Sequence, residues 1–392
     1  MTRYPAIRWL ATALLALLTF QVNAGEQIDH KIPPGYVPED ARDEQGLWME
    51  FEEAERKLNQ SALLVRDADI VNYISQITCR VAADYCSDFR IYVVRNPHFN
   101  ASMTATGMMQ VWTGLIVRAQ SSDEIATVIA HEIAHYTRLH SLERFRDLKA
   151  KMARGSFFDL TLLALTGVSV PVGQMTAMMS FLSFNRQQET EADLLGARLL
   201  ADAGYDPHAS YRVWRKIIAE EEAAVAKSDE PDIFSNTHPA SEDRADYLET
   251  WVKSRYGSPD AELVSDEAFL EILNKHYLFL MEDQIDTNRF GRTRALLERH
   301  AEIGVEPSLV RYFYGEMFRQ RGREGDAELA IAAYRHSIEG GAAPSEAYKN
   351  LGYLQLKAGN LEAAKRRFHE YLDIAPQASD RAMIEFYLEE GR

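Results

Sequence analysis

The sequence predicts an α+β protein in which a mostly helical domain with a small antiparallel sheet precedes an α-helical repeat domain. Three observations lead to this prediction: two short segments rich in β-formers, several stretches with helical periodicity, and a repeat pattern in the C-terminal third. The length of 392 residues suits two or three domains. The hydrophobic content of 46% is normal for a globular protein, so each domain can build a core.

The N-terminus has the pattern of a signal peptide. Arg3 and Arg8 are basic, the apolar run Trp9–Phe20 follows, and Ala24 is a small residue at the expected cleavage point. The apolar run is shorter than the roughly 20 residues that a membrane span needs, and a retained anchor is the alternative. We therefore expect a cleavable signal peptide over residues 1–24 and export to the periplasm of a Gram-negative cell.

Charge and cysteine content narrow the class of partner and the compartment. The formal net charge is −16 at pH 7. Binding to nucleic acid needs clustered Lys and Arg, so this balance argues against nucleic acid as a partner. It also gives no support to a surface bound to anionic lipid. The two cysteines of this exported chain, Cys79 and Cys86, favour a disulfide, and a pair of buried thiols is the alternative.

The first half of the exported chain alternates between helical and extended patterns. Helices are predicted over residues 44–66 and 69–83, and strands over residues 89–95 and 108–112.

A long helix is predicted over residues 121–153. Ser121 and Glu124 have the spacing of a capping box, and apolar residues such as Val128 follow at helical spacing. Gly155 can end this helix.

Residues 160–185 contain no charged side chain. One membrane crossing here would separate His135 from Glu189, which belong to one predicted metal site, and two crossings need roughly 40 residues. We therefore expect a hairpin of apolar helices, broken at Pro171 and Gly173 and buried near the active site. The alternative is that residues 156–184 grip apolar substrate or touch a membrane peripherally.

A further helix is predicted over residues 186–203, ended by Gly204. The turn-forming segment Tyr256–Pro259 marks a domain boundary. It divides the exported chain into a domain at residues 25–257, which holds the metal site, and a helical repeat domain at residues 258–392.

The C-terminal domain has the spacing of tetratricopeptide (TPR) repeats, whose period is about 34 residues. The best copy consists of Tyr348, Leu351, Gly352, Ala364, Phe368 and Pro376. An earlier copy consists of Tyr314, Gly315, Phe318, Ala330 and Tyr334. A weaker helix pair is predicted over residues 265–301 and a capping helix over residues 380–390. An ordinary bundle of α-hairpins is the alternative.

His131, Glu132 and His135 form the motif HExxH on the predicted helix 121–153. Four residues turn about 400° along a helix, so both imidazoles project from one face, one turn apart. This spacing lets both reach one zinc ion at about 2.0–2.1 Å. Glu132 is offset, so its carboxylate can reach a water molecule at the metal.

A third protein ligand must come from elsewhere in the chain. A metzincin would have Gly and His where this chain has Arg138 and Ser141. Glu189 and Asp193 lie one turn apart on the helix 186–203. Glu189 completes a His₂Glu, gluzincin-like site, and Asp193 can orient a ligand imidazole.

Two neighbouring polar residues receive no role in the site. His140 lies nine residues from His131, which places it on the opposite side of a continuous helix, so we interpret it as structural or exposed. Glu191 should point away from the site.

These motifs resemble the HtpX and CAAX-prenyl-protease family of metallopeptidases over roughly residues 70–250. The resemblance rests on the HExxH motif, Glu189-Thr190-Glu191-Ala192-Asp193, Asn100-Ala101, Thr113-Gly114-Leu115, Thr237-His238-Pro239 and Arg244. It implies zinc on His131, His135 and Glu189, with Glu132 as the catalytic base and Asp193 in support.

The family usually has Asn-Ala-x-x-x-Pro-Gly-Gly before its strand. This chain has Ala105 and Thr106 at the Pro and first Gly positions and keeps only Gly107. The signal peptide and repeats resemble the periplasmic BepA-like branch, which acts in outer-membrane protein quality control.

His238 has three alternative roles. It could stabilise the oxyanion, occupy the fourth metal position and hold the enzyme latent, or cap local structure.

The main functional hypothesis is a zinc endopeptidase, with one Zn²⁺ per chain, that acts on misfolded or stalled envelope proteins. In this hypothesis the TPR repeats dock polypeptide substrate or the outer-membrane assembly machinery. The alternative is a chaperone or scaffold whose metal site is latent. An intact Glu132 argues against the alternative, since a purely structural site needs no base.

Overall fold

The computed structural model describes residues 30–38, 42–153, 184–223, 238, 241–259 and 265–390. The predicted signal peptide and all but the last residue of the predicted apolar segment 156–184 lie outside the described residues. Residues Lys31–Arg392 cluster into one compact unit, which is the one described below. The domain division at residue 257 remains a prediction.

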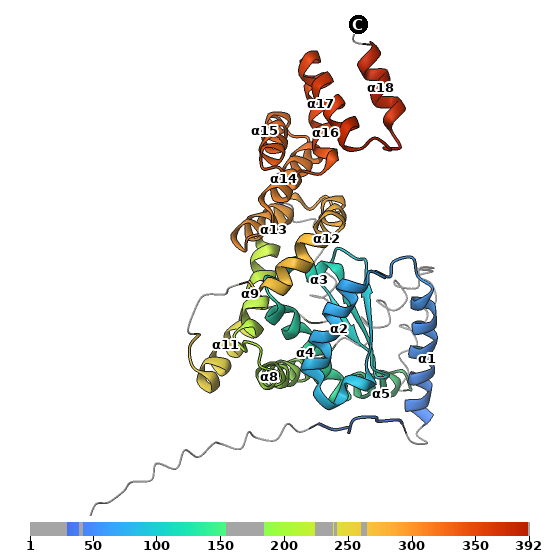
Figure 1. Cartoon of the computed structure of the whole chain (residues 1–392). Helices are drawn as coiled ribbons and strands as arrows, with labels where there is room; N and C mark the ends of the chain where they lie inside the picture. Colours follow the sequence, from blue (N-terminus) through green and yellow to red (C-terminus); the bar gives the residue numbers. More distant parts are fainter. Residues whose placement is uncertain are drawn as a thin grey trace, which may run out of the picture. The chain divides into compact units, whose positions relative to one another are not determined.

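The fold class is confirmed: the protein is mostly helical, with one small sheet (Figure 1). The sheet consists of β1 (Arg90–Val94), β2 (Ala101–Met103) and β3 (Met108–Trp112), in the order β1-β3-β2. β1 pairs with β3 in parallel and β2 with β3 antiparallel. The sheet is therefore mixed rather than antiparallel throughout. The reason is that the short strand β2, which sequence analysis missed, forms the hairpin with β3 and leaves β1 on the other side.

The β2–β3 turn explains why Gly107 is kept where the family pattern is otherwise lost. Gly107 has a φ of 80°, a conformation that favours glycine. A Cβ at this position would lie 2.3 Å from the carbonyl oxygen of Asp88. Both observations require a residue without a side chain.

Helices cover both faces of the sheet. α2 (Ala68–Ala82) and α4 (Ser122–Thr137) lie on one side, and α1 (Arg42–Asn59) lies on the other (Figure 1). The α1 side chains Leu47 and Phe51 are fully buried in a cluster with sheet residues. This arrangement holds α4, which carries the HExxH motif, against the edge strand β2.

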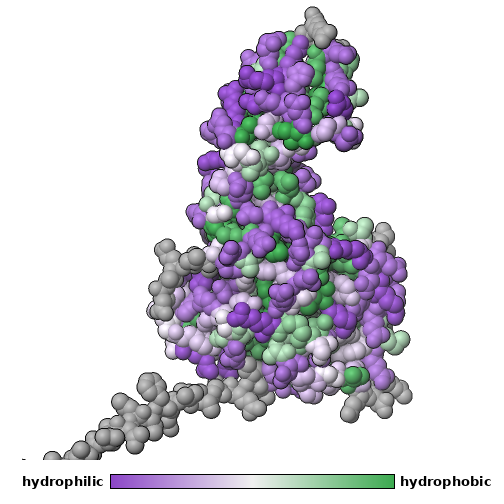
Figure 2. All heavy atoms as spheres, viewed as in Figure 1, coloured by the Kyte–Doolittle hydropathy of each residue, from purple (hydrophilic) through white to green (hydrophobic). Residues whose placement is uncertain are grey.

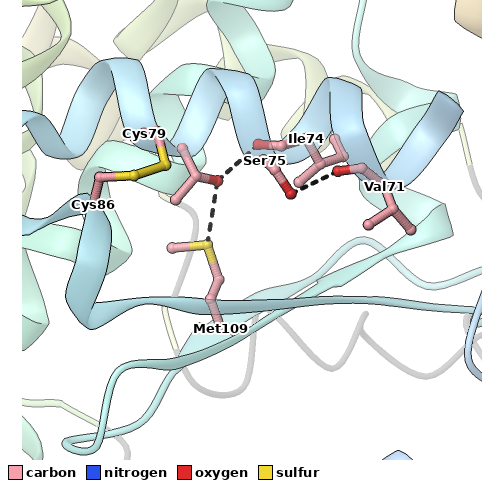
Figure 3. Close-up of a disulfide and its surroundings, with 7 residues drawn as sticks. Val71, Ile74, Ser75, Cys79, Cys86 and Met109 are labelled. Atoms are coloured by element: carbon pink, nitrogen blue, oxygen red, sulfur yellow. Dashed lines mark hydrogen bonds between the residues drawn. A yellow bond between two sulfur atoms is a disulfide. The ribbon is translucent and has the colours of Figure 1, made fainter. Parts of the chain in front are cut away.

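A disulfide joins Cys79 to Cys86 across the turn that follows α2 (Figure 3). The hydroxyl of Thr78 donates to the backbone oxygen of Ile74 at 2.8 Å and contacts the sulfur of Met109 at 3.8 Å. The bridged end of α2 therefore packs directly on strand β3.

The helix predicted over residues 121–153 is two helices, α4 and α5 (His140–Ala153). The break lies at Leu139, whose φ is 57°. The predicted capping box is also wrong, because the Ser121 side chain makes no cap hydrogen bond. Instead, Asp266 accepts hydrogen bonds from the backbone and side chain of Ser122, each at 2.7 Å.

The remaining elements around the site are helical. They are α3 (Thr113–Arg118), α8 (Arg186–Asp202), α9 (Ala209–Glu222) and α11 (Glu242–Tyr256).

The C-terminal part consists of helices at the predicted positions. They are α12 (Glu267–Asp286), α13 (Phe290–Glu302), α14 (Pro307–Arg321), α15 (Asp326–Glu339), α16 (Ser345–Lys357), α17 (Leu361–Ile374) and α18 (Arg381–Glu390). A Cβ at Gly315 would lie 2.5 Å from the Tyr334 ring, and one at Gly352 would lie 2.6 Å from the Phe368 ring. The same contact between a small and a large residue thus closes two successive hairpins.

A buried network joins these helices to the helices around the sheet. The Nε of Arg118 donates to Glu220 Oε1, and its Nη2 donates to Gln284 Oε1, both at 2.8 Å. Arg299 donates to the other oxygen of Glu220 at 2.6 Å. Since each charge has an oppositely charged partner, burial of the network is tolerated.

The face shown in Figure 2 is mostly hydrophilic, with apolar residues in smaller areas. In the part of the chain that the structure describes, none of the helices combines the length and the apolar character that a membrane crossing requires.

Candidate metal centre

Four buried side chains from α4, from α8 and from position 238 meet at one place. They are His131, His135, Glu189 and His238, and one donor atom from each lies within 4.8 Å of all the others. The structure therefore brings together the three predicted ligands and the residue whose role was left open.

The contacts within this cluster are short. His131 Nε2 lies 3.0 Å from His135 Nε2 and 3.1 Å from His238 Nδ1. Glu189 Oε1 lies 2.8 Å from His238 Nδ1 and 3.5 Å from His135 Nε2. Four donor atoms thus surround one point.

The donor set fits a zinc ion. With bonds of about 2.0–2.1 Å, the ligand atoms of a tetrahedral zinc site lie about 3.3 Å apart. The separations of 2.8–3.5 Å given above bracket that value, and all four donor atoms lie within 4.8 Å of one another. Imidazole nitrogens with one carboxylate oxygen are ligands that zinc prefers. A divalent metal, most suitably zinc, can therefore be held here.

Glu132 is buried beside the cluster, where sequence analysis expected it. Its Oε2 accepts a hydrogen bond from the backbone nitrogen of Met103, on edge strand β2, at 3.2 Å. Its Oε1 has no hydrogen-bond partner among the described residues and lies 3.5 Å from His238 Nε2. One carboxylate oxygen is thus anchored, and the other faces the cluster.

Asp193 contacts the other ring nitrogen of His131. Its Oδ1 lies 3.0 Å from His131 Nδ1. Arg244 donates to both carboxylate oxygens of Asp193, each at 2.7 Å, and the hydroxyl of Tyr247 also donates to Asp193. The guanidinium of Arg244 lies 3.9 Å from the centre of the Trp214 ring. Asp193 is thereby held in one orientation toward His131.

The charges of the site follow from burial and partners. Burial raises the pKa of the Glu132 carboxyl. Burial also acts to raise the pKa of Glu189, but the neighbouring imidazoles outweigh it, so the pKa lies well below its usual range. The same opposition acts on Asp193, where Arg244 and His131 lower the pKa. Both α8 carboxylates are therefore ionised at neutral pH.

Two residues that sequence analysis excluded contact the site. His140 is fully buried, and its Nδ1 lies 2.9 Å from His135 Nδ1. Its Nε2 lies 3.3 Å from Glu191 Oε2. The placement of His140 on the opposite face was wrong because it assumed a continuous helix, whereas the chain turns at Leu139. Glu191 does not point away from the site but reaches it through His140.

Other contacts had weaker signals in the sequence. Arg244 was noted only as part of a family pattern, and its two bonds to Asp193 give it a structural reason. Tyr247 follows Arg244 by one helical turn, which places both side chains near Asp193. Trp214 had no local signal.

Comparison with known proteins agrees with this geometry. Residues 65–252 match Peptidase family M48. These residues are therefore similar to M48 peptidases. The match includes every member of the cluster and ends before α12, so the predicted relationship to this metallopeptidase family is confirmed.

Several curated proteins are similar to part of this chain. The mitochondrial metalloendopeptidase OMA1 of Schizosaccharomyces pombe is 30% identical over 46% of this chain and 52% of its own length. The beta-barrel assembly-enhancing protease of Yersinia pestis is 26% identical over 60% of this chain and 51% of its own. The beta-barrel assembly-enhancing protease of Escherichia coli is 27% identical over 48% of this chain and 40% of its own length. The chain thus spans about half the length, or less, of these curated relatives.

Proposed function

We propose that this protein is an exported zinc-dependent endopeptidase that hydrolyses peptide bonds of misfolded or stalled envelope proteins in the periplasm. The observation that carries the proposal is the buried cluster of His131, His135, Glu189 and His238 with Glu132 beside it. The M48 match and the relatives, which are named as proteases, support the same reaction class.

The proposed roles follow from the contacts. His131, His135 and Glu189 would hold a zinc ion, which would supply the Lewis acidity needed to activate water and to polarise a peptide carbonyl. Glu132 accepts a proton from the attacking water at its Oε1 and passes it to the leaving amine. The backbone of Met103 holds the other oxygen of Glu132 in place. Asp193 is a positioning residue, because its carboxylate contacts the imidazole of the proposed ligand His131.

We assign His238 to the fourth metal position. Its Nδ1 lies 3.1 Å from His131 Nε2 and 2.8 Å from Glu189 Oε1, close to the separations of 3.0 and 3.5 Å among the three other donors. A catalytic zinc keeps one position open, whereas four protein ligands close the site. The arrangement described here therefore supports a latent state, from which His238 must move before substrate can bind.

The C-terminal helices are proposed to dock polypeptide substrate or a component of outer-membrane assembly. Support comes from the successive hairpins with repeated Gly–aromatic contacts and from relatives named for beta-barrel assembly. The four-ligand donor set is also compatible with a second candidate function, that of a chaperone or scaffold with a latent metal site. The position of Glu132 favours the peptidase.

The experiment that tests the proposal measures zinc content and casein digestion for the mature protein and for Glu132→Gln. We expect one zinc per chain in both, with digestion reduced by about 10²–10⁴-fold in the variant. Glu222→Gln, at an exposed position of α9, is the matched control and should digest like wild type.

If neither protein binds zinc, the proposal is wrong. If both bind zinc and neither digests casein, the scaffold candidate gains support, and release of latency becomes the next test.

A further inference from the structure

We propose that His140 and Glu191 are positioning residues for His135, so that each imidazole of the HExxH motif is oriented by its own carboxylate from α8. Asp193 orients His131 directly, and Glu191 orients His135 through the ring of His140. The inference rests on the proposed function, since it treats His135 as a metal ligand.

The direction of each hydrogen bond follows from the ring nitrogens. His135 Nε2 lies inside the donor cluster, 3.0 Å from His131 Nε2. A nitrogen that gives its lone pair to a metal carries no proton, so the proton of this ring sits on Nδ1. His135 Nδ1 then donates to His140 Nδ1 at 2.9 Å. His140 must carry its own proton on Nε2, which faces Glu191 Oε2 at 3.3 Å.

Both relays end in the same way. Asp193 is paired with Arg244, and Glu191 is paired with Arg138. The two carboxylates differ in burial: the side chain of Asp193 is 2% exposed and that of Glu191 is 31% exposed. Water screens the more exposed carboxylate, so we expect Glu191 to contribute less than Asp193.

The chain reversal at Leu139 is what builds this second relay. Its φ of 57° separates α4 from α5 and returns His140 to the side of α4 that carries His135. The ring of Phe184 stacks on His135 with centroids 3.8 Å apart and planes 18° apart. Phe184 thus restrains the tilt of the His135 ring, and the bond to His140 sets the rotation within its plane.

The test compares zinc affinity among variants by competition with a chromophoric chelator. His140→Leu introduces an apolar side chain of similar size and removes the acceptor for His135. His140→Asn restores an acceptor near the position of Nδ1. We expect His140→Leu to bind zinc about 10–100-fold more weakly and His140→Asn to recover most of that loss. His336→Leu, at an exposed position of α15, is the control and should match wild type.

A Co²⁺-substituted protein gives a second readout, because its visible absorption reports ligand geometry. We expect a changed spectrum in His140→Leu and a near-normal one in His140→Asn. Equal zinc affinity in wild type and His140→Leu would overturn the inference, as would an equal loss in both variants, because filling of space would then explain the residue.

If His140→Leu does not fold, Glu191→Gln carries the test, since its side chain is partly exposed. We expect it to weaken zinc binding several-fold, and unchanged affinity would overturn the relay. The two proposals fail differently. If the wild-type protein binds no zinc, the proposed function is wrong. If the wild-type protein binds zinc and the His140 and Glu191 variants bind it equally well, only the relay is wrong.

Discussion

Gly196 of α8 lies against the backbone of His131 in α4: a Cβ at Gly196 would be 3.1 Å from the His131 nitrogen and 3.2 Å from its Cα. Glycine within a helix costs about 0.5–1 kcal/mol relative to alanine. Here it allows two helices to approach closely, and that approach brings Glu189 and Asp193 of α8 to the imidazoles of α4.

Gly196→Ala should therefore weaken the site. Overpacking costs about 1–3 kcal/mol, which outweighs the gain in helix propensity, and separation of the helices should lower zinc affinity several-fold. Thermal unfolding and chelator competition measure the two effects. The control is Gly46→Ala in α1, where a Cβ would meet nothing within 4 Å. This substitution should stabilise the protein by up to about 1 kcal/mol. Destabilisation by both changes would show that close approach is not the cause.

Asp193→Asn should lower both zinc affinity and stability. The change weakens the orientation of His131, which we expect to cost about 10–100-fold in zinc affinity. It also removes one of the two carboxylates that pair with buried Arg244, the other being Glu189, which should cost at most about 3–5 kcal/mol in unfolding free energy. Chelator competition and urea unfolding are the measurements. Asp202→Asn, exposed on the same helix, should change neither. Full zinc affinity in Asp193→Asn would argue against a positioning role.

His238→Ala should raise peptidase activity several-fold, because it opens the fourth position while three ligands remain. Casein digestion and zinc content, measured together, check this. Lower activity with zinc retained would instead indicate that His238 stabilises the oxyanion, and unchanged activity would indicate a local structural role.

Acid should destabilise the protein through His300. Its Nε2 donates to the backbone oxygen of Val117 at 2.7 Å, and the hydroxyl of Tyr277 donates to its Nδ1, also at 2.7 Å. Burial lowers the pKa of His300 to about 3, with added repulsion from Arg299 and Arg118.

The pKa of His300 in the folded protein lies below the unfolded value of about 6.5. The stability that the neutral, buried ring contributes is therefore fully present above pH ~6.5 and is lost as pH falls toward about 3. The slope should approach about 1.4 kcal/mol per pH unit. Urea unfolding between about pH 7 and pH 5 should show a shallower loss in His300→Gln than in wild type. Parallel curves would contradict this assignment.

Local patterns in the sequence were sufficient for much of the architecture. Strand β3 matches its predicted bounds, although all five of its residues are buried and its burial does not alternate. Helices α2 and α8 match theirs to within one residue, because burial of one face imposes a helical spacing on each. The HExxH and Glu-x-x-x-Asp spacings likewise placed His131, His135, Glu189 and Asp193 on the faces where they lie, since residues one helical turn apart share a face.

The tertiary structure decided what depends on contacts between distant residues. The left-handed conformation at Leu139 has no glycine that would predict it from the sequence, and without that turn His140 cannot be placed beside His135. Three other features also depend on distant residues: β2 pairs with β3, the start of α4 is bound by Asp266, and Arg244 donates hydrogen bonds to Asp193. Sequence spacing determines which side chains share a face of one element. Only the packing of elements against each other determines which faces meet, because that packing depends on the burial and charge pairing of the whole domain.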